Sequence, residues 1–592
     1  MNIKFTGTFD DLKAKLKSLS GEWDESQPNK KILRVKGGVL NWFESTGTLS
    51  VQGRSPGKEQ LESSVPHLIY PDEFPQQAAN ALNDQIATKG PTTATIENAI
   101  GIEHLYLTSE LKESELVIGI VNAVGTESKR VLDPLSDRLK GFGYAVQDIR
   151  VSSLLPPSSS KDGEYERIKH YMNKGDELRN VARNNAILAT GASSKIKETR
   201  TGEPQKTAYI INSLKHPDEV EFLRKVYGDG FCLFGIHADE KRRHDYLVKD
   251  KSLTQEQAGE LIRIDEDEKI PHGQRTRDTF HLSDFFISLG KNDDQVKNTI
   301  QRFLELIFSN PFRNPTFDEF AMFMAFNSSI RSADLSRQVG AVIARNQQII
   351  ATGANDTPRH GGGQYWAEID PATGEVRDYP DGKDYTREED SNKAAQKEII
   401  EEITRALIAK SVADENKKSD IEDVLRQSKI ADLTEFGRVV HAEMEAILSC
   451  SREGISTLNG TLYCTTFPCH NCAKHIIDAG IIRVVYVEPY PKSRALDLHS
   501  ESIELKTSHD EPPTENRVIF EPFTGVGARR FLDLFSMALG SGSKVKRKNK
   551  DGNTVEWNKE NAVARTPLLS KSYLQVEEAA SNIWKQSQEG NS

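Results

Sequence analysis

Cysteines and long apolar runs are scarce in this sequence, and each scarcity excludes a class of protein. Five cysteines among 592 residues are too few for a disulfide framework, and their odd number favours reduced thiols. No stretch approaches the roughly 20 apolar residues of a membrane-spanning helix, and the first residues lack the apolar core of a signal peptide. We therefore expect a cytoplasmic protein without a membrane partner.

Positive charge is also in deficit. The chain carries 77 Lys and Arg against 88 Asp and Glu, which gives a formal net charge of −11. This balance argues against broad binding of nucleic acid, although the basic run in residues 544–550 offers a local patch. With 36% hydrophobic and 28% charged residues the composition is that of a globular chain, and its length predicts roughly three to five domains.

Residues 1–55 are predicted to form a small α+β module. Thr8, followed by Asp11 three residues later, is a typical helix N-cap. Alternation of polar and apolar residues then predicts two or three strands. These strands cover residues 31–36, 39–44 and 48–52. Residues 56–110 are rich in Pro, Gln, Ser and Thr, a composition that predicts a linker.

Residues 111–312 are predicted to form a doubly wound α/β domain. The continuous apolar run 116–121 is typical of a buried parallel strand, and later strands alternate with helical patterns. The later strands are expected at 144–151, 207–212 and 231–237. Gly119, Gly125 and Thr126 are our candidate contacts for a nucleotide effector at the first strand-to-helix turn. We do not expect ATP hydrolysis, because the two glycines are one residue too far apart for a phosphate loop and its lysine is missing.

Residues 313–540 are predicted to form a third domain, followed by a C-terminal tail, 541–592. It begins with a hairpin and is interrupted by a charged insertion at about 356–436. The order helix, strand, helix, strand then follows. These elements are expected at 442–451, 461–465, 469–479 and 482–487.

The residues with clear chemistry lie at the starts of the two helices in the third domain. His441-Ala-Glu443 precedes the first helix, and Pro468-Cys469-His-Asn-Cys472 opens the second. Two cysteines at a helix N-terminus bring two sulfurs to one point and favour thiolates. With His441 they make three zinc ligands, which leaves the fourth position for water, while Glu443 is placed to move protons. This H-x-E…P-C-x-x-C order is the signature of zinc nucleobase deaminases.

A structural zinc site is the alternative, with His470 or His475 as the fourth ligand. It explains neither Glu443 nor Pro468.

The same two blocks carry a family resemblance. Residues 440–447 and 467–481 resemble the deoxycytidylate deaminase branch of the cytidine deaminase superfamily, and residues 336–343 and 352–355 resemble its first hairpin. The whole chain resembles bacterial anti-phage dCTP/dCMP deaminases, which have a nucleotide-kinase-like domain ahead of the deaminase. The resemblance implies an α/β multidomain fold, in which a kinase-like doubly wound parallel sheet precedes a cytidine-deaminase-like α/β/α sandwich.

The resemblance also implies an activity. Zn²⁺ held by His441, Cys469 and Cys472 would activate water, and Glu443 would carry protons in the hydrolytic deamination of dCTP and/or dCMP. Deoxyuridine nucleotides and ammonia would be the products, and depletion of deoxycytidine nucleotides would serve anti-phage defence. We also expect a homo-oligomer.

The substrate contacts are less defined by their patterns. By position Asn355 matches the family residue that holds the sugar, although it also suits a turn after a strand. The other candidates contact phosphate, or else belong to solvated loops. They are Ser336, Arg337, Lys492, Ser493 and Arg494. Glu445 departs from the family pattern, which has a neutral amide there.

Two other functions fit parts of the sequence. A deaminase of cytosine or adenine in RNA or DNA would use residues 544–550 as an anchor, but the net charge of −11 disfavours it. A nucleotide-sensing scaffold with a structural zinc would have no use for Glu443.

Overall fold

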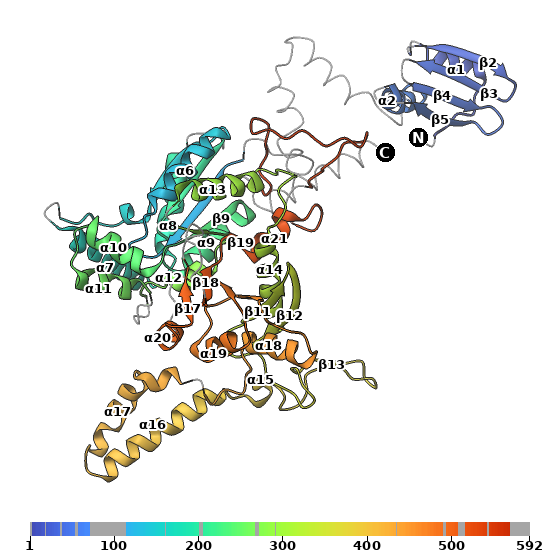
Figure 1. Ribbon diagram of the computed structural model, residues 1–592. Coiled ribbons are helices and arrows are strands. Elements are labelled where there is room, and N and C mark those ends of the chain that lie inside the picture. Colours follow the sequence, from blue (N-terminus) through green and yellow to red (C-terminus); the bar gives the residue numbers. More distant parts are fainter. Residues whose placement is uncertain are drawn as a thin grey trace. The chain divides into compact units, whose positions relative to one another are not determined.

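The computed structural model describes most of the chain. The described residues are 3–17, 19, 21–35, 38–53, 57–70, 114–159, 162–200, 205–266, 272–290, 292–433, 435–488, 493–506, 516–540 and 544–568. They divide into two compact units, one within Met1–Glu110 and the other within Leu111–Ser570 (Figure 1). In these stretches no helix is long and apolar enough to cross a membrane.

The N-terminal unit is a five-stranded antiparallel sheet with two helices. Its strands run in the order β1-β5-β4-β3-β2. Their bounds are β1 Ile3–Lys4, β2 Glu22–Gln27, β3 Lys30–Val35, β4 Gly38–Phe43 and β5 Thr48–Gly53, with α1 Phe9–Lys15 and α2 Gly57–Ile69. The predicted cap of the first helix is confirmed, because Thr8 and Asp11 form a reciprocal capping box. The sheet has two strands more than the sequence predicted. Helix α2 occupies the start of the predicted linker, whose residues 71–110 lie outside the described part.

The second unit contains a mostly parallel six-stranded sheet in the order β19-β10-β9-β6-β8-β7. The strands are β6 Leu116–Asn122, β7 Ala145–Arg150, β8 Thr207–Asn212, β9 Phe231–His237, β10 Phe285–Ser288 and β19 Gly525–Val526. Every residue of β6 and β9 is buried, and for β6 the continuous apolar run predicted this. From β6 the chain continues to β7 at one edge of the sheet, and from β8 it crosses β6 to reach β9 toward the other edge. This reversal of direction confirms the doubly wound topology.

Helices cover both faces of this sheet. Ile118 and Ile120 pack in one core cluster with α6 and α13, whereas Val117 and Val121 pack in another with α8 and α9. The helix bounds are α6 Lys129–Gly141, α7 Glu164–Ala182, α8 Ile187–Thr199, α9 Pro217–Tyr227, α10 Glu240–Lys249, α11 Gln255–Glu266, α12 Thr276–His281 and α13 Asp293–Ile307, with the 3₁₀ helices η1 Val151–Leu154 and η2 Gly228–Gly230. Alternate residues of one strand thus serve opposite layers.

A second sheet, in the order β12-β11-β15-β16-β18-β17, carries the third region of the chain. Its strands are β11 Gly340–Arg345, β12 Gln348–Ala354, β15 Thr461–Cys464, β16 Arg483–Tyr486, β17 Ile503–Leu505 and β18 Val518–Pro522. Val342 packs in one cluster with α14, and Ile343 packs in another with the two helices α18 and α19. The predicted α/β/α sandwich is therefore confirmed. The helices are α14 Phe317–Ser329, α18 Ala442–Arg452, α19 His470–Asp478, α20 Ala495–Leu498 and α21 Ala528–Phe535.

The hairpin β11–β12 lies so close to its flanking helices that glycine is required on it. A Cβ on Gly340 would lie 1.9 Å from the Ala325 carbonyl oxygen of α14, and one on Gly353 would lie 2.1 Å from the Ala442 carbonyl oxygen of α18. Real Cβ contacts essentially never fall below 3.0 Å. These two glycines therefore set the distance of α18 from the sheet.

The two sheets belong to one core. Strand β19 comes from the far end of the second sheet's sequence, yet it pairs antiparallel with β10 of the first sheet. One cluster contains buried residues from both sheets, among them Val117 and Val342. Residues 111–312 and 313–540 thus share a strand and a core rather than meeting only at a linker.

The regular elements of the insertion at about 356–436 are mainly helices. Its elements are β13 Glu368–Ile369, β14 Val376–Arg377, α15 Asp384–Arg387, α16 Ser391–Ala409, α17 Lys418–Arg426 and the 3₁₀ helices η3 Glu415–Lys417 and η4 Lys429–Asp432. Helices α16 and α17 pack against each other (Figure 1). Lys383 forms a buried ion pair with Asp356, which lies two residues after β12 at the start of the insertion.

Part of the predicted tail packs on the same unit. Ala562 and Ala564 join the core cluster on one face of the first sheet. The Trp557 indole N–H donates to the Phe308 carbonyl oxygen at 3.0 Å. Residues 541–543 and 569–592 lie outside the described part.

Candidate metal centre

Two helix N-termini bring together the three residues predicted to bind zinc. His441 is the N-cap of α18, Cys469 is the N-cap of α19, and Cys472 lies in the first turn of α19. The Nδ1 atom of His441 lies 3.4 Å from each of the two sulfur atoms. Ordinary Zn–S and Zn–N bonds arranged tetrahedrally separate such atoms by about 3.5 Å. The spacing of the ligand atoms therefore fits Zn²⁺.

The charge of this donor set also suits a cation. A hydrogen bond from Cys472, together with one from His441, lowers the pKa of Cys469 to about 3 against the opposing effect of burial. The same bond to Cys469, together with burial, raises the pKa of Cys472 well above its usual range. Hydrogen bonding to Cys469 raises the pKa of His441 to about 9. Cys469 is thus held as a thiolate, the form that binds metal.

Within the described stretches, the metal-binding group comprises His441, Cys469 and Cys472 alone. His475, one candidate for a fourth ligand of a structural site, is exposed on α19, and His470 is half-buried outside the group. Three protein ligands leave one tetrahedral position for water or substrate, which is the arrangement of a catalytic zinc.

Glu443 lies beside this group on the first turn of α18 and is 3% exposed. Burial raises the pKa of its carboxyl, while the His441 imidazole acts in the opposite direction. A carboxyl with a raised pKa exchanges protons more readily near neutral pH. Glu445, two residues further on, is engaged elsewhere, because its Oε1 accepts a hydrogen bond from Arg452 at 2.6 Å.

The side-chain amide of Asn355, just after β12, is fully engaged with the backbone that leads into β11. Its Nδ2 donates to the Arg337 carbonyl oxygen at 2.8 Å, and its Oδ1 accepts from the Val339 amide at 2.7 Å. Both ends of the side chain therefore hold the 337–339 backbone.

Ser336 and Arg337 belong to an exposed loop beside the metal-binding group. Their backbone amides donate to Asp334 Oδ1 at 2.8 Å and 2.9 Å. The Asp334 carboxylate also contributes to the raised pKa of His441, which places this loop next to the metal ligands. The side chains of Ser336 and Arg337 are exposed there.

The candidates after β16 are only partly described. Lys492 lies outside the described residues. Ser493 Oγ accepts a hydrogen bond from the Ala495 amide at 3.1 Å, and Arg494 is exposed at the start of α20.

The first strand-to-helix turn of the other sheet is tightly packed. Gly119 lies within β6, where an added Cβ would meet Phe231 at 2.7 Å. Gly125 has φ +81°, and a Cβ added to it would lie 2.7 Å from the Arg243 carbonyl oxygen. Thr126 is buried. The amide between these glycines, that of Val124, donates to Asp265 Oδ2 at 2.8 Å.

Two buried ion pairs had almost no signal in the sequence. Arg277 of α12 makes two 2.9 Å hydrogen bonds to Glu488, just after β16, and His281 lies 3.4 Å from the same carboxylate. Lys383 and Asp356 form the other pair. Arg277 and Glu488 are 211 residues apart, so only a charged residue directly after a buried strand hinted at the site.

Three ligands of zinc type and a buried carboxyl at facing helix N-termini define a hydrolytic metal centre. The comparison with protein families agrees: residues 315–488 match the cytidine and deoxycytidylate deaminase zinc-binding region. This segment, less than a third of the chain, is thus similar to the zinc-binding region of those deaminases.

Individual relatives cover different shares of the chain. Deoxycytidylate deaminase of Saccharomyces cerevisiae is 25% identical over 293 residues, 48% of this chain and 76% of that protein. Deoxycytidylate deaminase of Enterobacteria phage T4 is 29% identical over 171 residues, 29% of this chain and 77% of that protein. ComE operon protein 2 of Bacillus subtilis is 51% identical over only 53 residues, 9% of this chain and 28% of that protein.

Among solved structures, dCMP deaminase from the cyanophage S-TIM5 in complex with dCMP and dUMP is 20% identical and aligns over 36% of this chain and 100% of its own. Its TM-score is 0.20, too low to bear on the architecture.

Proposed function

We propose that this chain deaminates deoxycytidine nucleotides, dCTP and/or dCMP, to deoxyuridine nucleotides and ammonia. The observation that carries the proposal is the buried Glu443 carboxyl beside three zinc-type ligands. A structural zinc has no need of such a carboxyl, whereas a hydrolytic site requires a group that moves protons. The similarity of residues 315–488 to deoxycytidylate deaminases supports the same reaction.

Zn²⁺ and Glu443 would have separate roles in the reaction. When bound, Zn²⁺ supplies the positive charge that makes water acidic enough to react near neutral pH. Glu443 accepts a proton from the attacking water and delivers it to N3 of cytosine as the C4–O bond forms. It then passes the second proton to the 4-amino group as the C4–N bond breaks, so ammonia leaves and uracil remains. The raised pKa of Glu443 suits both transfers.

The surrounding loops position the nucleotide. Asn355 holds the 337–339 backbone in place at the site, and the exposed Ser336 and Arg337 face the phosphate side of the substrate. Lys492, Ser493 and Arg494 would contribute a hydroxyl and two cations, and guanidinium and ammonium groups suit a phosphate.

The biological part of the proposal rests on the resemblance to anti-phage deaminases. The enzyme would work in the cytoplasm as a homo-oligomer and deplete deoxycytidine nucleotides during infection. An effector bound at the first sheet would control it. Phage plating on cells that carry the wild type or Glu443→Gln tests this role, since only the wild type should protect.

Purified zinc-loaded protein tests the reaction itself. It is incubated with dCMP, dCTP, CTP and a cytosine-containing oligonucleotide, and ammonia release is followed. Turnover of dCMP or dCTP is expected, whereas turnover of the oligonucleotide alone would replace this proposal with a polynucleotide deaminase. Glu443→Gln should keep zinc and lose activity, and Cys469→Ala should lose both. Glu453→Gln, at the exposed far end of the same helix, is the matched control. Loss of zinc in Glu443→Gln would contradict the proton-transfer role.

A further inference from the structure

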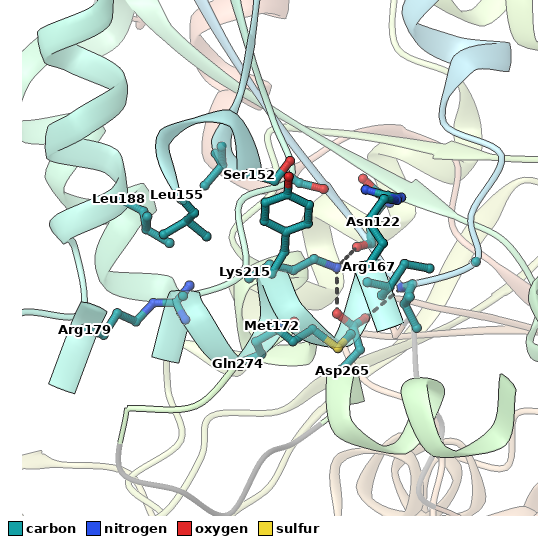
Figure 2. Close-up of a pocket in the computed structure, with 17 residues that line it drawn as sticks. Asn122, Ser152, Leu155, Arg167, Met172, Arg179, Leu188, Lys215, Asp265 and Gln274 are labelled. Atoms are coloured by element: carbon teal, nitrogen blue, oxygen red, sulfur yellow. Dashed lines mark hydrogen bonds and ion pairs between the residues drawn. The ribbon is translucent and has the colours of Figure 1, made fainter. Parts of the chain in front are cut away.

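A cavity of about 230 Å³ lies at the carboxyl ends of the strands of the first sheet, outside the region matched by the deaminase family (Figure 2). Asn122 ends β6, Ser152 and Leu155 follow β7, and Lys215 follows β8. Helix α7 supplies Tyr171 and Met172. In open α/β sheets ligands bind at this edge of the strands. The volume is below the roughly 300–1,000 Å³ of pockets for drug-sized ligands, which favours a small ligand.

The cations on the cavity wall are already neutralised. Lys215 Nζ lies 2.7 Å from Asp265 Oδ1, as Figure 2 shows. Arg179 pairs with Glu219 and Asp176, and Arg167 pairs with Glu164. No lysine or arginine among the described residues of the wall therefore lacks a carboxylate partner. The cavity is charge-balanced without a ligand.

A carboxylate of the protein also occupies the place where a phosphate would bind. In phosphate-binding loops, the backbone amides after the first strand point at the phosphate. Here the Val124 amide donates to Asp265 Oδ2 at 2.8 Å. A phosphate at this turn would have to displace Asp265 from both Val124 and Lys215. The ligand of the cavity is accordingly uncharged.

The remaining surface suits a flat heterocycle. Leu155 and Leu188 lie on one side of the cavity and Asn122 and Asp265 on the other (Figure 2). Asn122 is 7% exposed, and its side-chain oxygen is buried without a hydrogen-bond partner. An N–H group at the edge of a base would satisfy that oxygen, while aliphatic side chains and Tyr171 would pack on the faces of the ring.

The polar side of the cavity is connected to Glu488, just after β16, through the short helix α12. At the cavity, the Arg275 amide donates to the Lys215 carbonyl oxygen at 2.8 Å, and Thr276 Oγ1 donates to Asp265 Oδ1 at 3.2 Å. On its other side, α12 holds Glu488 through Arg277 and His281. Glu488 is buried after β16 and precedes Ser493 and Arg494 along the chain, the predicted phosphate contacts.

We propose that this cavity binds an uncharged nucleoside and that its occupancy is transmitted through α12 to the substrate side of the metal centre. The binding step stands alone, whereas the regulatory meaning of the coupling rests on the deaminase function proposed above. A ligand that moves the Lys215–Asp265 pair shifts the position of α12, which contacts both residues. Glu488 moves with α12, because its carboxylate accepts two hydrogen bonds from the Arg277 guanidinium.

Binding is tested on the full chain by equilibrium dialysis with deoxyadenosine, deoxyguanosine, thymidine and deoxyuridine. Gly175→Leu fills the cavity from α7, where an added Cβ meets its nearest neighbours at 3.6 Å and 3.7 Å without a clash. Gly259→Leu is the matched control, because a Cβ there meets nothing within 4 Å. At least one nucleoside should bind, with a loss of roughly tenfold or more in Gly175→Leu only.

Three results would overturn the binding step. The first is that none of the four nucleosides binds at millimolar concentration, and the second is that binding is unchanged in Gly175→Leu. The third is that the 5′-triphosphates or inorganic phosphate bind this cavity more tightly than the nucleosides, which would show that Asp265 yields to an anion.

The coupling is tested by hydrogen exchange, which does not depend on activity. The bound nucleoside should change exchange in residues 483–498 of the wild type and of Arg275→Gln, whose guanidinium is exposed and pairs with Asp278. Arg277→Gln should still bind the nucleoside but show no change there. An equal response in Arg277→Gln would refute transmission through α12. If no nucleotide is deaminated while these results hold, the proposed function fails and the site stands.

Discussion

The buried pair of Lys383 and Asp356 gives the sharpest test of how the insertion supports the metal centre. Lys383 Nζ lies 2.7 Å from Asp356 Oδ2, and the two side chains are 6% and 2% exposed. Removing one partner of a buried pair costs about 3–5 kcal/mol, because the other charge stays buried without compensation. The Thr357 amide also donates to Asp356 at 2.8 Å, so we expect Lys383→Met to cost about 3 kcal/mol, at the lower end of that range.

This loss should reach the zinc ligands. Asp356 and Val440 exchange two backbone hydrogen bonds, of 3.2 Å and 2.9 Å, directly before His441. Lys383→Met should therefore bind zinc more weakly in competition with a chelator, besides unfolding at lower urea concentration. The variant Lys383→Met/Asp356→Asn should recover part of the stability, since no charge is then left buried.

The matched control is Lys397→Met. Lys397 pairs with Glu401 on α16, but its side chain is 75% exposed, and exposed pairs of this kind contribute less than about 0.5 kcal/mol. If Lys383→Met is no more destabilising than Lys397→Met, the buried pair does not anchor the insertion.

Three further outcomes follow from the structure. Glu443→Gln should lower the deamination rate by about 10²–10⁴-fold at unchanged zinc content, the usual contribution of a proton-transferring group, and a smaller loss would argue for a minor role. Gly353→Ala should displace α18 and weaken zinc binding, since its Cβ would lie 2.1 Å from a carbonyl oxygen, whereas Gly141→Ala meets nothing and should be tolerated. Burial lowers the pKa of His237 to about 3. Between pH 6.5 and that value only the unfolded chain binds the proton, so the free energy of unfolding decreases by up to about 1.4 kcal/mol for each unit that the pH falls. Urea midpoints at pH 7.5 and 5.5 should differ less in His237→Leu than in the wild type, while the exposed His360→Leu should leave the difference unchanged.

Much of the fold was predictable because its patterns are local. The apolar runs of β8 and β9 predicted both strands at their observed bounds, since a strand buried on both faces tolerates few polar residues. The Thr8 capping box and the hairpin of β11 and β12 followed from residues three to five positions apart. Strands β1 and β2 were missed because short or exposed strands carry little apolar signal.

The metal ligands were predictable for a related reason. Cys469 and Cys472 lie within one helical turn, and His441 precedes another helix earlier in the chain. The order of the histidine motif followed by the cysteine motif is characteristic of zinc nucleobase deaminases. The roles of Asn355, Arg337 and Arg494 remain predictions, because a polar residue in a loop has the same local pattern whether it contacts substrate or backbone.

The sequence by itself thus determined the chemistry of the metal centre and most of the strands, because those depend on neighbours along the chain. Only the tertiary structure decided that β19 completes the first sheet, that Glu488 is held by Arg277, and that Asp265 accepts a hydrogen bond from the Val124 amide at the turn after β6. Each of these contacts joins residues more than 100 positions apart. Their partners are chosen by the packing of whole layers, which no local pattern records.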